Sequence, residues 1–174
     1  MGLFLLPDAR VGDRCTPEMG LVHSKKNISV KVLSKGCIYG LRALLFIVSE
    51  KPSAEYVSIR EISEELDISF HFLTKTFQAL TQKGILRSYR GPNGGVALAK
   101  APEEVFLADI VLTLEGEDFF NKCLLGLAGC GEAAPCPVHD FWIGHKAELR
   151  AEFERTSLAD MGRKINREKL RLGP

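Results

Sequence analysis

The feature that most constrains the fold of this chain is a pair of short helix patterns joined by a turn, within residues 58–84. The first pattern begins at Ser58, which forms a capping-box motif with Glu61 that satisfies free backbone N–H groups. Apolar residues then recur every three or four positions, as one buried helix face requires. The second pattern begins at Ser69 and ends before Gly84, in the usual place of a left-handed helix end. Two such helices around a short turn predict a helix-turn-helix.

A hairpin signal follows this pair of helices directly. Two apolar-alternating stretches, 85–89 and 96–99, flank the sequence Arg-Gly-Pro-Asn-Gly-Gly at residues 90–95. A Pro-Asn-Gly-Gly turn between alternating strands is typical of a β-hairpin. A hairpin placed immediately after a helix-turn-helix predicts a wing.

Helical spacing extends over much of the remaining chain. The expected elements are a helix capped by Ser34 and closed by Pro52, a connecting helix at 102–116, a loop at 117–136, a long amphipathic helix at about 137–155, a short polar helix at 157–168, and a mobile basic tail. The fold class we predict is mainly α with a small β wing, in the form of a winged helix-turn-helix plus a long C-terminal helix. The apolar stripe of that helix needs a partner surface, and a second copy of the chain is the simplest one.

These patterns divide the chain into five parts. The parts are a disordered leader at 1–28, a winged helix-turn-helix DNA-binding domain at 29–101, a connecting helix at 102–116, a cysteine loop at 117–136, and a dimerisation helix with its tail at 137–174.

The net charge of +1 hides an uneven distribution of charge along the chain. Residues 24–100 carry twelve basic and six acidic side chains, whereas residues 101–174 carry nine basic and thirteen acidic ones. The stretch from Ile68 to Lys100, which holds the second helix of the pair and the wing, contains no acidic residue. A helix and a wing that approach phosphates must keep carboxylates away, so this pattern favours DNA binding over a merely solvated basic face.

Three cysteines and a histidine lie together in the sequence. Six residues separate Cys123 from Cys130, five separate Cys130 from Cys136, and His139 follows three positions later. Zinc ligands are usually paired at two to four residues' separation, so the wider gaps favour a bulkier iron–sulfur cluster. A zinc site and a reversible thiol switch remain alternatives.

Other classes of protein are less compatible with the sequence. The longest apolar run, Ala43–Val48, is far shorter than the roughly 20 residues of a membrane helix, so we expect a soluble cytoplasmic protein with no membrane partner. Its cysteines would be reduced in that compartment. A nucleophilic Cys136 with His139 as its base would suggest an enzyme, but the sequence offers neither an orienting third group nor an oxyanion element. We therefore expect no enzymatic activity.

At about residues 30–165 the chain resembles a known family. The shared motifs are Lys31–Gly36 before the first helix, the helix-turn-helix, the wing at 90–95, and the three loop cysteines followed by Pro137–Trp142. The chain is similar to the bacterial winged-helix regulators that include the iron–sulfur regulator IscR and the nitric-oxide sensor NsrR. The leader has no counterpart in that family, and Val30 stands where its initiator methionine is expected. We therefore expect the native product to start at Val30.

The resemblance implies a homodimeric transcriptional regulator, most simply a repressor, that reads a palindromic double-stranded operator. It also implies a [2Fe–2S] or [4Fe–4S] cluster on the loop cysteines, through which redox state, nitric oxide or iron–sulfur supply would control operator affinity. The positions that it assigns to DNA contact are Ser69, His71, Thr74 and Lys75 on the second helix of the pair, Arg90 in the wing, and Lys35 at the start of the first helix. Some members carry a glutamate at the position of Thr74, so operator preference does not transfer.

The fourth cluster ligand differs between branches of the family. A histidine three residues after the last cysteine serves in the IscR branch, and His139 matches it. In the NsrR branch a carboxylate near the start of the first helix of the other subunit serves, and Cys37 stands at that position. Cys37 could therefore complete an all-thiolate site across a dimer, or it could be an ordinary buried thiol. The alternative function is a cluster-free regulator that uses its loop cysteines as a thiol switch or zinc site.

Overall fold

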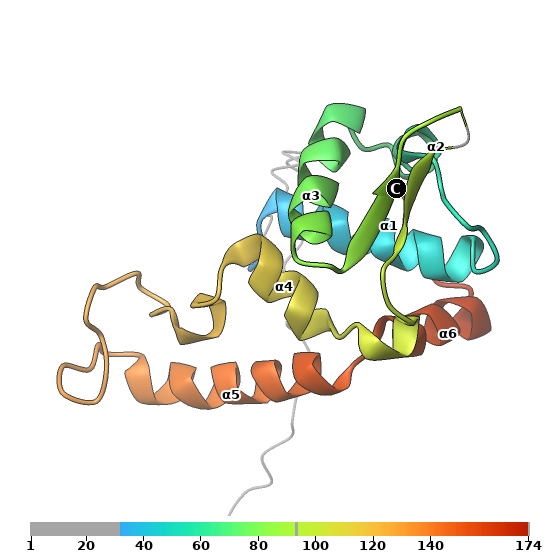
Figure 1. Cartoon of the computed structure of the whole chain (residues 1–174). Helices are drawn as coiled ribbons and strands as arrows, with labels where there is room; N and C mark the ends of the chain where they lie inside the picture. Colours follow the sequence, from blue (N-terminus) through green and yellow to red (C-terminus); the bar gives the residue numbers. More distant parts are fainter. Residues whose placement is uncertain (1–31, 93, 174) are drawn as a thin grey trace, which may run out of the picture. The chain divides into compact units, whose positions relative to one another are not determined.

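The computed structural model describes residues 32–92 and 94–173. The predicted disordered leader at 1–28 and the predicted start at Val30 lie outside these ranges. The elements in chain order are α1 (Lys35–Glu50), α2 (Ile59–Leu66), α3 (Phe70–Gln82), β1 (Leu86–Tyr89), β2 (Gly95–Leu98), the 3-10 turn η1 (Pro102–Glu104), α4 (Leu107–Glu115), the 3-10 turn η2 (Phe119–Asn121), α5 (His139–Arg155) and α6 (Leu158–Glu168). The predicted fold class, mainly α with one small antiparallel hairpin, is confirmed (Figure 1).

Two of the predicted helix starts are held by serine caps. The Ser34 hydroxyl accepts a hydrogen bond from the Cys37 N–H at 3.2 Å, and the Ser58 hydroxyl accepts one from the Arg60 N–H at 3.3 Å. The reciprocal half of the predicted capping box does not form, because the Glu61 carboxylate pairs with the Lys51 ammonium at 2.6 Å. This ion pair ties the start of α2 to the end of α1.

Gly84 ends the second helix of the pair as predicted. Its φ of +69° is in the left-handed region, which glycine enters without a Cβ clash. The turn lets the Ile85 N–H donate to the Leu80 carbonyl at 3.0 Å, which closes the carbonyl end of α3. The chain therefore leaves α3 directly into β1.

The wing is fixed to the domain by a backbone bridge. β1 and β2 pair antiparallel, and β2 is bonded on its other side to the segment before α2, where Val57 and Val96 exchange two N–H···O bonds of 2.9 Å. A Cβ at Gly95 would lie only 2.2 Å from the Val57 carbonyl oxygen, so this contact needs a glycine. The bridge sets the position of the wing relative to the two helices.

The hydrophobic core surrounds α1, which packs against α2, α3, α4 and α6. Its largest fully buried side chains include Phe77, Leu44, Ile62, Leu73, Leu80 and Ile110. The short polar helix predicted at 157–168 is α6, and its inner face adds Leu158 and Ile165 to this core. In the described part of the chain, none of the helices has both the length and the apolar character that a membrane crossing requires.

The connecting helix predicted at 102–116 is interrupted. The backbone at Val105 and Phe106 is extended between η1 and α4, because it forms a bridge with the junction of α5 and α6. The Val105 carbonyl accepts from the Leu158 N–H at 2.9 Å, and the Leu107 N–H donates to the Thr156 carbonyl at 3.0 Å. These tertiary hydrogen bonds replace the helical ones that the sequence pattern predicts.

The basic tail, which we predict to be mobile, contacts the domain at residues 169–173 in the structure. The Arg42 guanidinium donates to the Leu172 carbonyl at 2.6 Å and to the Leu66 carbonyl at 2.9 Å. The Leu172 side chain packs against the core beside these bonds. One arginine of α1 thus holds both the end of α2 and the tail.

Candidate DNA-binding face and metal centre

Helix α3 and the wing form one continuous face, and most of the predicted DNA contacts lie on it (Figure 1). Ser69, at the amino end of α3, is exposed and makes no capping bond with its side chain. His71 and Lys75 are exposed on the first turns of α3, and Arg90 is exposed where β1 ends. Free polar side chains at a helix start and in a wing are available to a ligand.

Two further predicted DNA contacts have different surroundings. Thr74 is half-buried, and its hydroxyl donates back to the Phe70 carbonyl at 2.8 Å. Lys35 is exposed in the first turn of α1. Thr74 and Arg90 both line a groove of about 610 Å³ between α3 and the wing, whereas Lys35 does not line it.

The three loop cysteines come together in space. Their Sγ atoms all lie within 4.8 Å of one another, and those of Cys123 and Cys136 are 3.7 Å apart. The Sγ atom of Cys130 lies 3.4 Å from Nδ1 of His139, the first residue of α5. The His139 N–H donates to the Cys136 carbonyl at 3.0 Å, which ties the end of the loop to the start of that helix. Four soft donors from 17 residues of chain therefore converge on one place.

The thiols of this cluster differ in acidity. The backbone N–H of Leu127 is the main cause that lowers the pKa of Cys123 to about 7, and the neighbouring thiols assist. A backbone hydrogen bond at Cys136 lowers the pKa of Cys130, but desolvation and the adjacent thiols outweigh it and raise that pKa overall. Metals and oxidants react with the thiolate form, so Cys123 is the thiol most readily available to either at neutral pH.

The donor set fits a soft metal centre. Zn–S bonds of about 2.3 Å in a tetrahedral site place two thiolate sulfurs roughly 3.8 Å apart, close to the distance between Cys123 and Cys136. The loop backbone is open to its surroundings at Gly126, Gly129 and Gly131, where a Cβ would meet no atom within 4 Å. Three thiols with an imidazole suit zinc or an iron–sulfur cluster by donor chemistry.

Cys37 is not brought to the other cysteines within one chain. It is fully buried with Val111 and Phe120 at the start of α1. Burial is the main cause that raises the pKa of Cys37 to about 12, and the Glu115 carboxylate adds to the shift. Within the single chain Cys37 is therefore a neutral thiol, and its predicted role across a dimer stays a prediction.

Comparison with known proteins identifies the family. Residues 33–164 match the model of the Rrf2 family, described as iron-dependent transcriptional regulators. The chain belongs to the Rrf2 family. It is 32% identical over 138 residues to a candidate HTH-type transcriptional regulator of Aquifex aeolicus, with 78% of this chain and 92% of that one covered. It is also 27% identical over 132 residues to the HTH-type transcriptional regulator IscR of Aliivibrio salmonicida, with 76% and 77% covered.

Solved structures share the fold of this chain. CymR, named as the global cysteine regulator of B. subtilis, aligns with a TM-score of 0.63 at 22% identity, covering 76% of this chain and 96% of that one. An oxidised form of Staphylococcus aureus CymR aligns with a TM-score of 0.58 at 25% identity, covering 74% and 94%. This Rrf2 chain is thus a transcriptional regulator of winged-helix fold, and its family is not one of enzymes.

The structure of this Rrf2 chain adds residues to the candidate DNA-binding face that the sequence does not reveal. Arg60, Phe70, Gln78 and Tyr89 line the groove with Thr74. Arg60 offered a signal, since an arginine in the first turn of a helix is opposed by the helix dipole. The others offered none, because only the fold brings α2 next to the wing.

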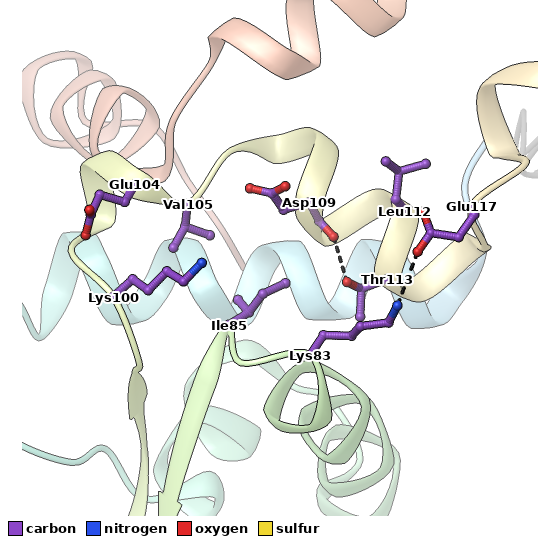
Figure 2. Close-up of a pocket in the computed structure, with 9 residues that line it drawn as sticks. All are labelled: Lys83, Ile85, Lys100, Glu104, Val105, Asp109, Leu112, Thr113 and Glu117. Carbon is purple, nitrogen blue, oxygen red and sulfur yellow. Dashed lines mark hydrogen bonds and ion pairs between the residues drawn. The ribbon is translucent and has the colours of Figure 1, made fainter.

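A second cavity lies where the DNA-binding domain meets α4. It has a volume of about 230 Å³, and its lining combines apolar residues such as Ile85 and Val105 with charged side chains at the rim. Figure 2 shows Lys83, at the end of α3, reaching across to Glu117 at the start of the cysteine loop, with the two charges 3.2 Å apart. The end of helix α3 and the loop that carries the thiols are thus in direct contact.

Proposed function

We propose that this Rrf2 regulator is a homodimeric repressor whose operator affinity depends on an iron–sulfur cluster held by Cys123, Cys130, Cys136 and His139. The observation that carries the proposal is the convergence of three thiols within 4.8 Å beside an imidazole, in a chain with a winged helix-turn-helix. The IscR relative and the family description as iron-dependent regulators support the same assignment.

The chain's own residues would bind and position the cluster. The three thiolates supply negative charge and soft sulfur ligands, and His139 is the proposed fourth donor because its Nδ1 already lies 3.4 Å from Cys130. A bound cluster would supply reactivity toward oxygen, nitric oxide or a change in iron–sulfur supply. Backbone N–H groups around Cys123 would stabilise the thiolate form that binding requires.

The path from the loop to the DNA-binding face is short in this chain. Glu117, at the start of the loop, pairs with Lys83 at the end of α3, and the Glu115 carboxylate accepts a hydrogen bond of 2.6 Å from the Ser34 N–H at the start of α1. A loop that changes shape when the cluster is altered would therefore act on the end of α3 through Glu117, and on the start of α1 through Glu115 at the end of α4, next to the loop. We propose this as the coupling between cluster state and operator affinity.

The proposed homodimer rests on exposed apolar side chains of α5, a helix that packs within its own chain against α4 through Leu149 and Phe153. None of the residues of α5 is buried in the single chain, and Phe141 and Ile143 are 61% and 48% exposed. A second copy of the chain would cover these exposed apolar side chains. A second copy would bring two recognition helices together, as a palindromic double-stranded operator requires.

The test is purification without oxygen from cells with a normal iron supply. We expect a red-brown protein with acid-labile sulfide and a native mass of a dimer carrying the cluster. Operator binding measured before and after cluster removal then shows which form represses. A colourless protein without sulfide would contradict the cluster and leave zinc or a thiol switch.

The identity of the fourth donor gives a direct prediction. His139→Ala should change the absorbance spectrum of the cluster and shorten its lifetime in air, because an imidazole donor is lost. Cys37→Ala should leave both unchanged, since that thiol is buried and neutral within its own chain. Absorbance decay of the two variants, purified in parallel, measures this. The opposite pattern would assign the fourth position to Cys37 of the second subunit.

A second prediction concerns the wing. Arg90→Ala should weaken specific operator binding by about 1 to 3 kcal/mol, roughly 5- to 150-fold, because an exposed arginine at the start of the wing can read a base edge. Fluorescence anisotropy with specific and scrambled duplexes measures the effect. Equal losses on both duplexes would show that Arg90 contacts only the backbone.

The alternative function is a cluster-free thiol switch or zinc site. The 3.7 Å between Cys123 and Cys136 favours it, because a small movement would allow a disulfide of about 2.05 Å between the sulfurs. The oxidised CymR structure shows that a protein of this fold can be obtained in an oxidised form. Thiol titration and metal analysis of the colourless protein would distinguish a thiol switch from a zinc site.

A further inference from the structure

Arg60 is an unpaired cation at a position where the helix itself disfavours one. It lies in the first turn of α2, next to the positive end of the helix dipole. In the part of the chain that the structure describes it forms no ion pair, and its neighbour Glu61 is engaged with Lys51. Its guanidinium instead lies 5.9 Å from the centre of the Phe70 ring. A residue that violates a local preference without a partner inside the fold points to a ligand outside it.

The groove beside Arg60 has the character of an anion site. The start of α2 and one face of α3 supply part of its lining, and the wing supplies the rest. Among the described residues, Arg60 and Arg90 are its only charged lining residues, and no carboxylate lines it. The neutral polar side chains of Gln78, Ser88 and Tyr89 offer further hydrogen-bond donors.

The geometry of a winged helix defines what lies opposite this groove. A recognition helix in the major groove and a wing at the adjacent minor groove are separated on the DNA by one sugar-phosphate strand. The groove between α3 and the wing therefore faces that strand. In helix-turn-helix proteins the first helix of the pair also crosses the backbone, and Arg60 is at its start.

We infer that this groove seats one sugar-phosphate strand of the operator and that Arg60 donates to a phosphate there. The inference rests on the operator binding proposed above and assigns a contact to α2. Phe70 positions the arginine by contact with its guanidinium, which leaves the N–H groups free for the phosphate. Arg60 thus adds affinity without reading sequence.

The chain supplies a matched control in Arg87. This arginine lies in the wing, is exposed, and also stacks on an aromatic ring, with its guanidinium 5.3 Å from the centre of the Tyr56 ring. It lines a different cavity, on the side of the wing that faces the end of α1, and does not line the groove. Arg60 and Arg87 are thus both arginines beside an aromatic ring, but only Arg60 lines the groove.

The experiment measures the salt dependence of DNA binding for the full chain and for Arg60→Ala, Arg60→Lys and Arg87→Ala. The probe is a duplex selected in vitro by the unmodified protein, alongside a scrambled duplex, with affinity measured over a potassium chloride series. Arg60→Ala should weaken binding to both duplexes by roughly 5- to 10-fold per bound chain at low salt. It should also reduce the slope of log affinity against log salt by about 0.9 per chain. Arg60→Lys and Arg87→Ala should keep the slope of the unmodified protein.

Three outcomes would overturn the inference. They are an unchanged slope for Arg60→Ala, an equal loss of slope for Arg87→Ala, and a loss for Arg60→Ala that is confined to the selected duplex. The midpoint temperature of thermal unfolding should be unchanged or slightly raised in Arg60→Ala, because the variant removes a cation from the positive end of the α2 dipole. Weaker DNA binding by this variant can then not be attributed to misfolding. Failure of the unmodified protein to select any duplex would instead contradict operator binding itself.

Discussion

Replacing Cys136 with serine should remove nearly all bound iron and sulfide from the protein purified without oxygen. Cys136 is the most buried thiol of the loop cluster, at 8% exposure, and its Sγ lies 3.7 Å from that of Cys123. A serine hydroxyl has the same shape but is a hard, weakly acidic donor, which a soft metal centre does not accept in place of a thiolate. Two thiols and an imidazole cannot then hold the cluster against exchange.

The measurement is iron and sulfide per chain, with absorbance as a second readout. The backbone bond from His139 to the Cys136 carbonyl does not depend on the side chain, so the loop should keep its path and the variant should fold. Cys15→Ser, with both variants made as the full 174-residue chain, is the matched control, because it makes the same exchange in the leader that the sequence sets apart from the family resemblance. A Cys136→Ser protein that keeps the iron and sulfide of the control would show that Cys136 is not a ligand.

The same variant tests the link from cluster to operator. If cluster state sets affinity, Cys136→Ser should bind the operator as the cluster-free form of the unmodified protein does, and oxidants should no longer change its affinity. The contact between Lys83 and Glu117 lies outside the thiol site and remains in this variant. If the operator affinity of this variant still changed with oxidants, the response would be assigned to the two remaining loop thiols, Cys123 and Cys130.

The segment from Ser58 to Leu98 could be predicted from sequence because local rules decide it. A capping serine, helical spacing of apolar residues and a glycine with positive φ each act within a few residues, and the structure confirms all three. The wing was predictable for the same reason, since strand alternation and turn composition agree.

The failures lie where distant residues compete with local patterns. The helix expected at 102–116 breaks at Val105 because hydrogen bonds to Thr156 and Leu158 replace helical ones. The tail lies against the domain because Arg42 donates a hydrogen bond to the Leu172 carbonyl, 130 residues away in the chain. No window of sequence around either segment contains the partner that decides its structure.

The candidate metal centre shows the same division. Donor types and their clustering in one loop were visible in the sequence, because composition alone carries them. The sequence did not reveal which of these donors lie next to each other. Cys123 and Cys136 are 13 positions apart, yet their sulfurs lie 3.7 Å from each other. The Cys130 sulfur lies 3.4 Å from Nδ1 of His139. The path of a loop, unlike a helix or strand, has no period from which such distances could be calculated.

The stability of the DNA-binding domain should depend strongly on Phe77. This side chain is 2% exposed and extends from α3 into the core around α1. Phe77→Ala removes most of a buried aromatic ring and leaves a cavity, which costs about 3 to 5 kcal/mol. Small domains are stable by only about 5 to 15 kcal/mol, so this one change should remove a large fraction of the total.

Phe70→Ala is the matched control for this prediction, on the same helix and with the same exchange of residues. Phe70 is 40% exposed at the first turn of α3, with the Arg60 guanidinium 5.9 Å and the His71 ring 5.7 Å from its ring centre, so its loss should cost only about 0.5 to 1 kcal/mol. Urea unfolding of both variants in the metal-free state removes the contribution of cluster binding, and a single protein concentration keeps the contribution of dimer formation equal in the two variants. Equal destabilisation by the two variants would mean that α3 is not anchored through Phe77. A large loss confined to Phe77→Ala would show that the recognition helix is held in place from its buried face, which leaves its exposed residues free to read DNA.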